Sequence, residues 1–151
     1  MMRCHKVYIG SDHGGFLLKQ ELSCFLSSHG FEVEDAGVYN TDSADYPDIA
    51  IMVSEKVQQN PESKGILVCG SGIGMSMVAN KFKGIRAALC SEPLSAKLSR
   101  EHNDANILCL GARLIGTAMA TEIASVFLST DFSGDRHEKR IQKITKIEER
   151  K

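Results

Sequence analysis

The feature of this chain that most constrains its fold is a fivefold alternation of short apolar runs with longer amphipathic stretches. The runs have the length of strands, and the stretches repeat their apolar residues near the helical period. The expected strands are Lys6–Ile9, Phe31–Val33, Gly65–Cys69, Ile85–Cys90 and Ile107–Leu110. The expected helices are Phe16–Ser28, a helix from Asp45-Tyr46-Pro47 to about Asn60-Pro61, Met75–Phe82, Leu94–His102 and Ile115–Leu128. Short links between these elements predict an α/β protein with a parallel sheet and helices on both faces.

The length of the chain fits one domain, 1–151, since domains usually run about 100–200 residues. Beyond the alternating part we expect an extra C-terminal helix at about residues 135–151, after Gly134. With 42% hydrophobic and 25% charged residues, the composition is that of an ordinary globular protein.

Charge and cysteine content narrow the class of protein. The net charge of -1 leaves no basic excess to hold a nucleic-acid backbone. No apolar run approaches the ~20 residues of a membrane span, and Met1–Lys6 lacks the apolar region of a signal peptide. Five cysteines with no C-x-x-C spacing indicate reduced thiols rather than a disulfide framework. We therefore expect a cytoplasmic protein that binds neither nucleic acid nor membranes.

Ligands of parallel α/β sheets bind at the carboxyl ends of the strands, so the residues after each strand are the candidates for function. Gly70, Gly72 and Gly74 follow the third expected strand. At a helix N-terminus such glycines let backbone N–H groups converge on an anion. The alternative is a tight strand-to-helix turn that needs glycine for its backbone only. The spacing matches neither the G-x-G-x-x-G fingerprint nor a Walker A loop.

Three other segments carry reactive side chains, each with a plainer alternative. The Cys69 thiol lies beside a helix N-terminus, where a thiol can act as a base or a nucleophile. The alternative is a buried cysteine at the end of a strand. The side chains of Asp12 and His13 could bind sugar hydroxyls or a phosphate. The alternative is that Asp12 caps a helix and His13 lies in solvent. Taken alone, His102 near a helix end is more simply a surface histidine that complements the helix dipole.

The C-terminal segment is basic on an otherwise acidic chain. Residues 135–151 hold seven Lys or Arg against four Asp or Glu, whereas the rest of the chain holds 11 against 15. Ile141, Ile144 and Ile147 form an apolar strip, and Arg136 and Arg140 lie on another face. The segment is either a solvated amphipathic helix or an arm that docks its strip on a neighbour and directs its arginines at an anion. Calmodulin-type or membrane-surface binding is disfavoured by three glutamates.

Together these segments resemble one family, the type B ribose-5-phosphate isomerases with their galactose-6-phosphate and allose-6-phosphate isomerase relatives. The matches run in chain order from about residue 7 to residue 148. They are Gly10-Ser11-Asp12-His13-Gly14-Gly15-Phe16, Asp45-Tyr46-Pro47-Asp48, Cys69-Gly70-Ser71-Gly72-Ile73-Gly74-Met75-Ser76, Ala79-Asn80-Lys81, Gly84-Ile85-Arg86-Ala87, Cys90-Ser91-Glu92-Pro93, Glu101-His102-Asn103-Asp104-Ala105-Asn106, Gly111-Ala112-Arg113 and Arg136-His137-x-x-Arg140.

The resemblance implies a Rossmann-like three-layer α/β sandwich and a homodimer, often paired into a tetramer, with active sites shared between subunits. It implies interconversion of ribose 5-phosphate and ribulose 5-phosphate in the pentose phosphate pathway, by ring opening and enediolate proton transfer. It also implies that no metal and no organic cofactor takes part.

The resemblance assigns catalysis to Cys69, His102, Ser71 and Asp12. Cys69 is similar to the family's base, and Met75 stands where another branch carries a glutamate. His102 resembles the acid/base of ring opening, which Asp12 assists at the ring oxygen. The other substrate-binding residues implied are the anion-hole residues Gly70, Gly72, Ile73 and Gly74, the hydroxyl ligand Asn103, the site-lining Tyr46, and the phosphate ligands His13, Arg113, Arg136 and Arg140. Of these, the family supplies the last two arginines from the partner chain.

Three alternatives to a pentose phosphate isomerase stay open. An isomerase of a six-carbon sugar phosphate, allose 6-phosphate or galactose 6-phosphate, would use the same catalytic groups in a longer pocket. A noncatalytic phosphate-binding module would need the glycine turn and the arginines but neither Cys69 nor His102. A thiol hydrolase would place Cys69 in a covalent intermediate.

Overall fold

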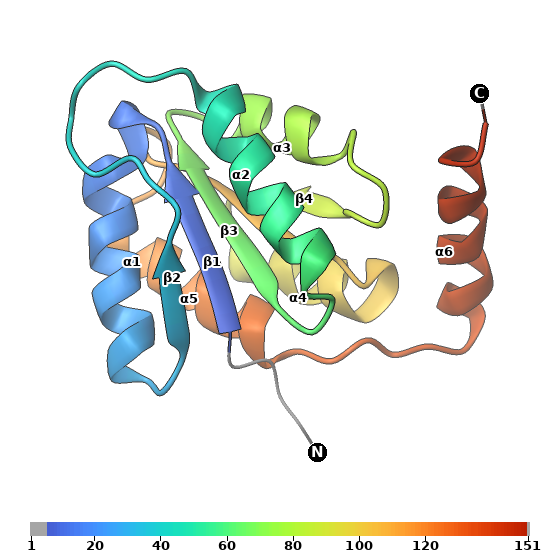
Figure 1. The fold of residues 1–151 in the computed structure, drawn as a ribbon. Helices are drawn as coiled ribbons and strands as arrows, with labels where there is room; N and C mark the ends of the chain where they lie inside the picture. Colours follow the sequence, from blue (N-terminus) through green and yellow to red (C-terminus); the bar gives the residue numbers. More distant parts are fainter. Residues whose placement is uncertain (1–5, 151) are drawn as a thin grey trace.

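The computed structural model describes residues 6–150, and it contains a five-stranded parallel sheet between layers of helices (Figure 1). The strands are β1 (Lys6–Ser11), β2 (Glu32–Asp35), β3 (Lys64–Cys69), β4 (Ala87–Leu89) and β5 (Ile107–Gly111). The helices are the short η1 (His13–Gly15), α1 (Phe16–Ser28), α2 (Tyr46–Gln59), α3 (Ile73–Ala79), α4 (Pro93–Asn103), α5 (Thr117–Ser129) and α6 (Arg136–Ile147). The expected α/β class, with its parallel sheet and extra C-terminal helix, is confirmed.

The strand order of the sheet decides where a ligand can enter. The order is β2-β1-β3-β5-β4, and every pair of neighbouring strands is parallel. From β1 the chain goes outward to β2 on one side, and from β3 onward it builds the other side of the sheet. The connections after β1 and β3 therefore diverge, which opens a crevice at the carboxyl ends of these two central strands.

Two apolar cores, one on each face of the sheet, hold the layers together. On one face, α1, α4 and α5 cover the sheet with buried side chains such as Leu22, Ala96 and Phe127. On the other face, α2 and α3 contribute Val53 and Met75 among others. Successive strand residues alternate between the two cores, as the pleat requires. Cys69 belongs to the α2/α3 core, which places its side chain directly behind the start of α3.

The last helix, α6, stands beside the β4 edge of the body and is joined to α5 by an extended connection (Figure 1). His137 and Ile141 on α6 are buried within this one chain. By contrast, Ile144 and Ile147 keep 44% and 57% of their surface exposed. The first isoleucine of the predicted strip thus packs on its own chain, and the other two stay open along a groove of about 390 Å³ against the body.

Some element boundaries differ from those predicted by the apolar pattern. The fourth strand begins at Ala87 rather than Ile85, because the Ile85 N–H donates to the Phe82 carbonyl and the Arg86 N–H donates to the Asn106 side chain. The third helix begins two residues earlier than expected, at Ile73, and the last ends at Ile147. Local hydrogen bonds, which periodicity does not report, set these limits.

Within residues 6–150, no helix combines the length and apolar character that a bilayer crossing requires. The prediction that Met1–Lys6 lacks the apolar region of a signal peptide concerns residues that, apart from Lys6, lie outside the described part of the chain. Cys4 also lies outside it.

Candidate functional site

A pocket of about 590 Å³ opens at the carboxyl ends of β1 and β3, where the strand order predicts a binding crevice. It is built from the turn after β1, the first residue of α2, the turn between β3 and α3, and the turn after β5. The predicted site residues that line it are Asp12, His13, Tyr46, Cys69, Gly70, Ser71, Ile73, Gly74 and Arg113. Segments far apart in the sequence thus form one concave surface.

Cys69 is the last residue of β3, and its side chain is held by the glycine turn (Gly70–Gly74) that follows. The Gly72 N–H donates to the Cys69 sulfur at 3.1 Å. Gly72 has φ +79, and a Cβ there would come within 2.6 Å of the Leu89 side chain. Only glycine satisfies both conditions without strain, so the turn that orients the sulfur depends on glycine at this position.

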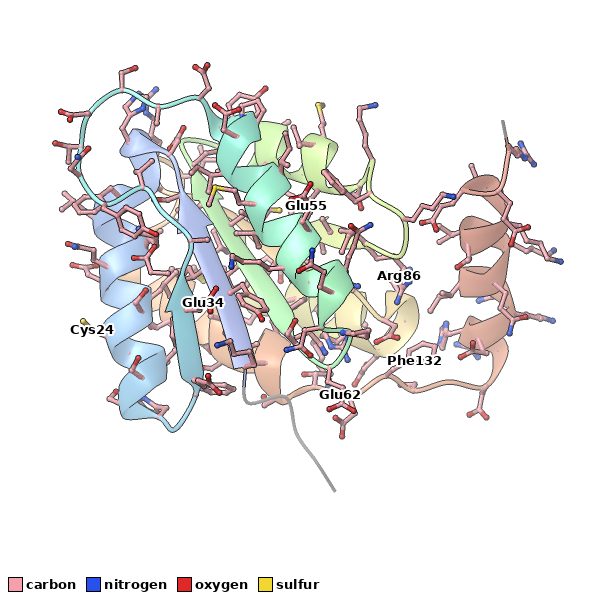
Figure 2. All side chains as sticks on the ribbon, viewed as in Figure 1. Cys24, Glu34, Glu55, Glu62, Arg86 and Phe132 are labelled. Carbon is pink, nitrogen blue, oxygen red and sulfur yellow. The ribbon has the colours of Figure 1, made fainter. Side chains whose placement is uncertain are left out.

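The other described cysteines have environments that do not suit a reactive thiol. Burial raises the pKa of the Cys109 thiol far above its ordinary value, and burial also raises the pKa of Cys90. Both thiols therefore stay protonated at neutral pH. Cys24 lies on the outer face of α1 (Figure 2). Of the four described cysteines, Cys69 is the one that lines the pocket.

Beyond Cys69, the glycine turn presents a mixture of backbone and side-chain groups. The Ser71 hydroxyl oxygen accepts from the Ile73 N–H at 3.2 Å, so the hydroxyl is held at the start of α3. Tyr46, the first residue of α2, packs on the turn so closely that a Cβ on Gly74 would lie 2.5 Å from its ring. Absence of a side chain at Gly74 therefore decides where the Tyr46 ring sits.

The turn after β1 contributes a carboxylate and an imidazole, and it has the helix cap and the exposed histidine of the plainer prediction. Asp12 caps η1, because its Oδ1 accepts from the Gly15 N–H at 3.1 Å, yet the residue also lines the pocket. His13 is exposed, and its Nδ1 lies 3.1 Å from the N–H of Ala44 in the loop before α2. This contact fixes the ring, whose other nitrogen can face an anion.

Arg113 completes the pocket from the turn after β5. Its backbone N–H donates to the Gly70 carbonyl at 3.0 Å, which ties this turn to the glycine turn. Its side chain lies over Gly70, with Cδ 3.5 Å from the position of a Cβ there. A guanidinium is thereby placed next to converging backbone N–H groups, an arrangement that suits a phosphate.

Gly72 lies within the glycine turn behind the pocket surface and does not line it. Four further predicted site residues are also absent from its lining within one chain: His102, Asn103, Arg136 and Arg140. Helix α4 connects the parallel strands β4 and β5, so it runs against the strand direction. It therefore ends near the amino ends of the strands, on the opposite side of the sheet from the pocket mouth. Asn106, shortly after α4, accepts from the Gly65 N–H near the start of β3. His102 and Asn103 therefore lie about one strand length from the pocket, roughly 17–20 Å.

These four residues gather instead around the contact between α4 and α6. The rings of His102 and His137 stack with their centroids 4.3 Å apart. Burial lowers the pKa of His137, and the nearby His102, Arg136 and Arg140 act in the same direction. Arg136 and Arg140 are exposed on the outside of α6. The chain thus carries a second group of predicted site residues, away from the pocket, near the amino ends of the strands.

Sequence reasoning missed the residues that support this second group. Asp104, with φ 45, accepts from Arg100 at 2.8 Å and from Arg86 at 3.3 Å. Arg100 also donates to the carbonyls of Ala105 and Thr130, which links the end of α4 to the connection before α6. Figure 2 shows Arg86 on the side of the body that faces α6. The positive φ of an aspartate after a helix could not be inferred from the sequence pattern.

Three pocket residues were also missed, namely Gly14, Met77 and Leu114. Met77 lies four residues after Ile73 on α3, so helical periodicity could have placed the two side chains on the same face. Leu114 follows Arg113 directly, and its exposure of 67% signals an apolar side chain at the mouth of the pocket.

Fold and pocket together define a doubly wound α/β protein with a thiol-containing pocket at the point where its strand order diverges. Comparison with known proteins gives the family. The family model for Ribose/Galactose Isomerase matches residues 7–144. Ribose-5-phosphate isomerase B of Escherichia coli is 45% identical over 146 residues, which cover 97% of this chain and 98% of that protein. The chain belongs to the ribose/galactose isomerase family.

Solved structures give the same picture. The structure of ribose-5-phosphate isomerase B from Clostridium thermocellum matches with a TM-score of 0.93 and 48% identity, and covers 95% of this chain and 97% of that one. That of ribose-5-phosphate isomerase B from Mycoplasma genitalium, with bound ribulose-5-phosphate, matches with a TM-score of 0.94 and 41% identity, over 97% of each chain. The family resemblance inferred from the strand-end motifs is confirmed.

Proposed function

We propose that this chain is an aldose–ketose isomerase that interconverts ribose 5-phosphate and ribulose 5-phosphate. The observation that carries the proposal is the pocket that joins Cys69 and the glycine turn to His13 and Arg113. A base, an anion hole and phosphate ligands are the three things that isomerisation of a sugar phosphate needs. The named relatives, and the ribulose-5-phosphate bound in the relative from Mycoplasma genitalium, support this substrate.

Cys69 acts as the base. Its thiolate takes the proton from C2 of the open-chain aldose, and the electron pair of that C–H bond forms the enediolate double bond. At the same time the electron pair of the C1 carbonyl moves onto O1. The resulting thiol returns the proton to C1, the C2 hydroxyl passes its proton to O1, and the C2 carbonyl of the ketose forms. The sulfur is buried at 5% exposure and is aligned by the Gly72 N–H, so it approaches the substrate from one fixed direction.

The glycine turn stabilises the charge that develops on the enediolate oxygen. The donors are backbone N–H groups of Gly70–Gly74 other than those of Gly72 and Ile73, which donate to the Cys69 sulfur and the Ser71 hydroxyl. The turn sets the positions of these donors before the substrate arrives. One such donor contributes roughly 3–4 kcal/mol to the transition state in measured oxyanion holes. Ser71 keeps a hydroxyl at the same turn, held by its contact with Ile73.

His102, Asn103, Arg136 and Arg140 reach the pocket from a second copy of the chain. Within one chain these residues lie near the amino ends of the strands, away from the pocket. The pocket of one chain therefore lacks His102 for ring opening and two of its four proposed phosphate ligands. A homodimer with shared sites supplies both: His102 opens the ring together with Asp12, and the two arginines join His13 and Arg113 on the phosphate. A tetramer of two such dimers keeps the same sites.

The test is an assay of the purified chain with ribose 5-phosphate and, separately, allose 6-phosphate, with a chelator present. We expect turnover of ribose 5-phosphate that the chelator leaves unchanged. Cys69→Ala should lower kcat by roughly 10²–10⁴-fold, the contribution of a positioned base. Cys109→Ala, which alters another strand-end cysteine of the same core, is the matched control and should retain kcat.

Each other outcome has a distinct meaning. Turnover of allose 6-phosphate alone would transfer the chain to the six-carbon branch of the family. Binding of phosphate without turnover of either sugar would support a noncatalytic module. A covalent adduct on Cys69 in the intact mass during turnover would contradict its role as a base.

A further inference from the structure

Lys19 on α1 has no solvent exposure at all, although lysine is among the residues least often buried. Its ammonium group donates to the Asp35 carboxylate at 2.8 Å and to the carbonyl of Val38. It also lies 5.3 Å from the ring centre of Phe16 and 5.5 Å from that of Tyr39. A charge removed from water in this way is retained only where all of its donors find partners.

The two hydrogen-bond partners of Lys19, Asp35 and Val38, lie at the end of β2 and at the start of the loop of residues 36–45, which connects β2 to α2. Asp35 precedes the loop and its Oδ1 also accepts from the Gly37 N–H at 2.8 Å. The Tyr39 hydroxyl donates to the Asp35 carbonyl at 3.1 Å. Lys19 therefore joins α1, the end of β2 and the first residues of this loop at a single point.

The far end of the same loop reaches the pocket. Ala44 contacts the Nδ1 atom of His13, and Tyr46, immediately after the loop, packs against Gly74 of the glycine turn. The start of the loop is also tied to β1, because the Ser11 N–H donates to the Gly37 carbonyl and the Val38 N–H donates to the Ser11 carbonyl, both at 2.8 Å. The loop is thus fixed at one end by Lys19 and holds two pocket residues at the other.

We propose that Lys19 is a positioning residue for substrate binding: by anchoring the 36–45 loop it sets the places of His13 and Tyr46 in the pocket. The proposal rests on the proposed function, in which His13 binds the phosphate. Cys69 and the glycine turn lie on β3 and α3 and have no contact with Lys19, so the proton-transfer step itself does not depend on it.

Stability alone does not explain a lysine at this position. Replacing a buried ion pair by an apolar side chain of similar volume is often neutral or stabilising. A methionine would fill the space between Phe16 and Tyr39, and Asp35, with 37% of its side chain exposed, would stay solvated and bonded to Gly37. What a methionine lacks is the directional bond to the Val38 carbonyl that fixes the loop.

The test is Lys19→Met, with Lys56→Met as the matched control. Lys56 also pairs with a carboxylate at 2.8 Å and lies over a tyrosine ring, but its partners Glu34 and Tyr8 are on β2 and β1, away from the loop. For Lys19→Met we expect KM for ribose 5-phosphate and the inhibition constant of inorganic phosphate to rise about tenfold, as small misplacements of binding groups do. We expect kcat to change by less than about threefold and the control to match wild type.

Amide hydrogen exchange supplies a readout that needs no activity. Residues 36–46 should exchange faster in Lys19→Met than in wild type or Lys56→Met, while the β3 amides stay protected. Unchanged KM and unchanged exchange in this segment would overturn the proposal, and so would equal losses in both variants. If wild type binds phosphate but fails to turn over ribose 5-phosphate, the proposed function fails. The dissociation constant of inorganic phosphate, measured directly by calorimetry, and the amide exchange then still decide the role of Lys19.

Discussion

At the scale of single residues, the contact between Gly74 and Tyr46 shows how closely one pocket wall is fitted. A Cβ at position 74 would lie 2.5 Å from two ring atoms of Tyr46, which is closer than real Cβ contacts allow. Tyr46 has 39% of its surface exposed, so its ring can swing away from the pocket. The position of the Tyr46 ring in the pocket wall therefore depends on the lack of a Cβ atom at Gly74.

Gly74→Ala should affect binding and stability in opposite directions. The new methyl group displaces the Tyr46 ring, and we expect KM for ribose 5-phosphate to rise about 5- to 10-fold, equivalent to ~1–1.4 kcal/mol of binding free energy. In helix α3, alanine is favoured over glycine by up to about 1 kcal/mol, so the free energy of unfolding should not fall. Steady-state kinetics and urea unfolding measure the two effects.

A double variant identifies the cause. If displacement of Tyr46 explains the rise in KM, Gly74→Ala should have no further effect in a Tyr46→Ala background. An additive effect of the two substitutions would show instead that the methyl group blocks the pocket directly.

At the scale of elements, α6 is held to the body by few contacts, and one of them titrates. His137 stacks on His102 at the end of α4, and burial lowers the pKa of His137 in the folded chain. An unfolded histidine titrates near its ordinary value of about 6.5. Between the two values the unfolded segment binds more protons, so the docking of α6 is strongest above about pH 6.5 and weakens as the pH falls.

Protection of the α6 amides from hydrogen exchange should therefore decrease between about pH 7.5 and about pH 5.5, after correction for the intrinsic exchange rate. His137→Gln, which cannot acquire a charge, should remove most of this dependence. His29→Gln changes an exposed histidine at the end of α1 and should leave the dependence intact. Equal behaviour of the two variants would contradict the assignment to His137.

At the scale of the whole molecule, the two groups of predicted site residues lie at opposite ends of the strands. One group is at the carboxyl ends and the other is near the amino ends. The pocket group includes Cys69 and Arg113, and the α4/α6 group includes His102, Arg136 and Arg140. A two-fold dimer is the simplest assembly in which each pocket meets the α4/α6 group of another copy. The arrangement predicts which two inactivating substitutions, placed on different chains of one dimer, leave one active site intact.

Co-expression of differently tagged Cys69→Ala and His102→Ala chains tests this assembly. In a mixed dimer one site receives both lesions and the other receives none, so the purified hybrid should have about half of the wild-type activity. The mirrored control pairs a wild-type chain with a chain that carries both substitutions. That hybrid should be inactive with shared sites, whereas sites formed within one chain would give the reverse result in both experiments.

The elements and the pocket residues could be predicted from the sequence because both depend on local chemistry. Apolar period identifies strands and helices, and a glycine turn after a buried strand identifies Cys69 and its neighbours. The boundaries near Ile85 and Ile73 could not be predicted, since they are set by backbone N–H groups that donate to oxygens of Phe82, Asn106 and Ser71. The burial of Lys19 was equally invisible, because the loop that covers it comes from another part of the chain.

By itself, the sequence determined the α/β class, the parallel sheet, the family and most of the residues that line the pocket. Tertiary structure alone decided which of the functional residues meet. His102 lies at the end of helix α4, which runs against the strands, so the fold carries it to the amino ends of the strands, where it stacks on His137. Periodicity and motifs are properties of neighbouring residues, whereas the meeting of distant side chains depends on strand order and helix direction, which exist only in the folded chain.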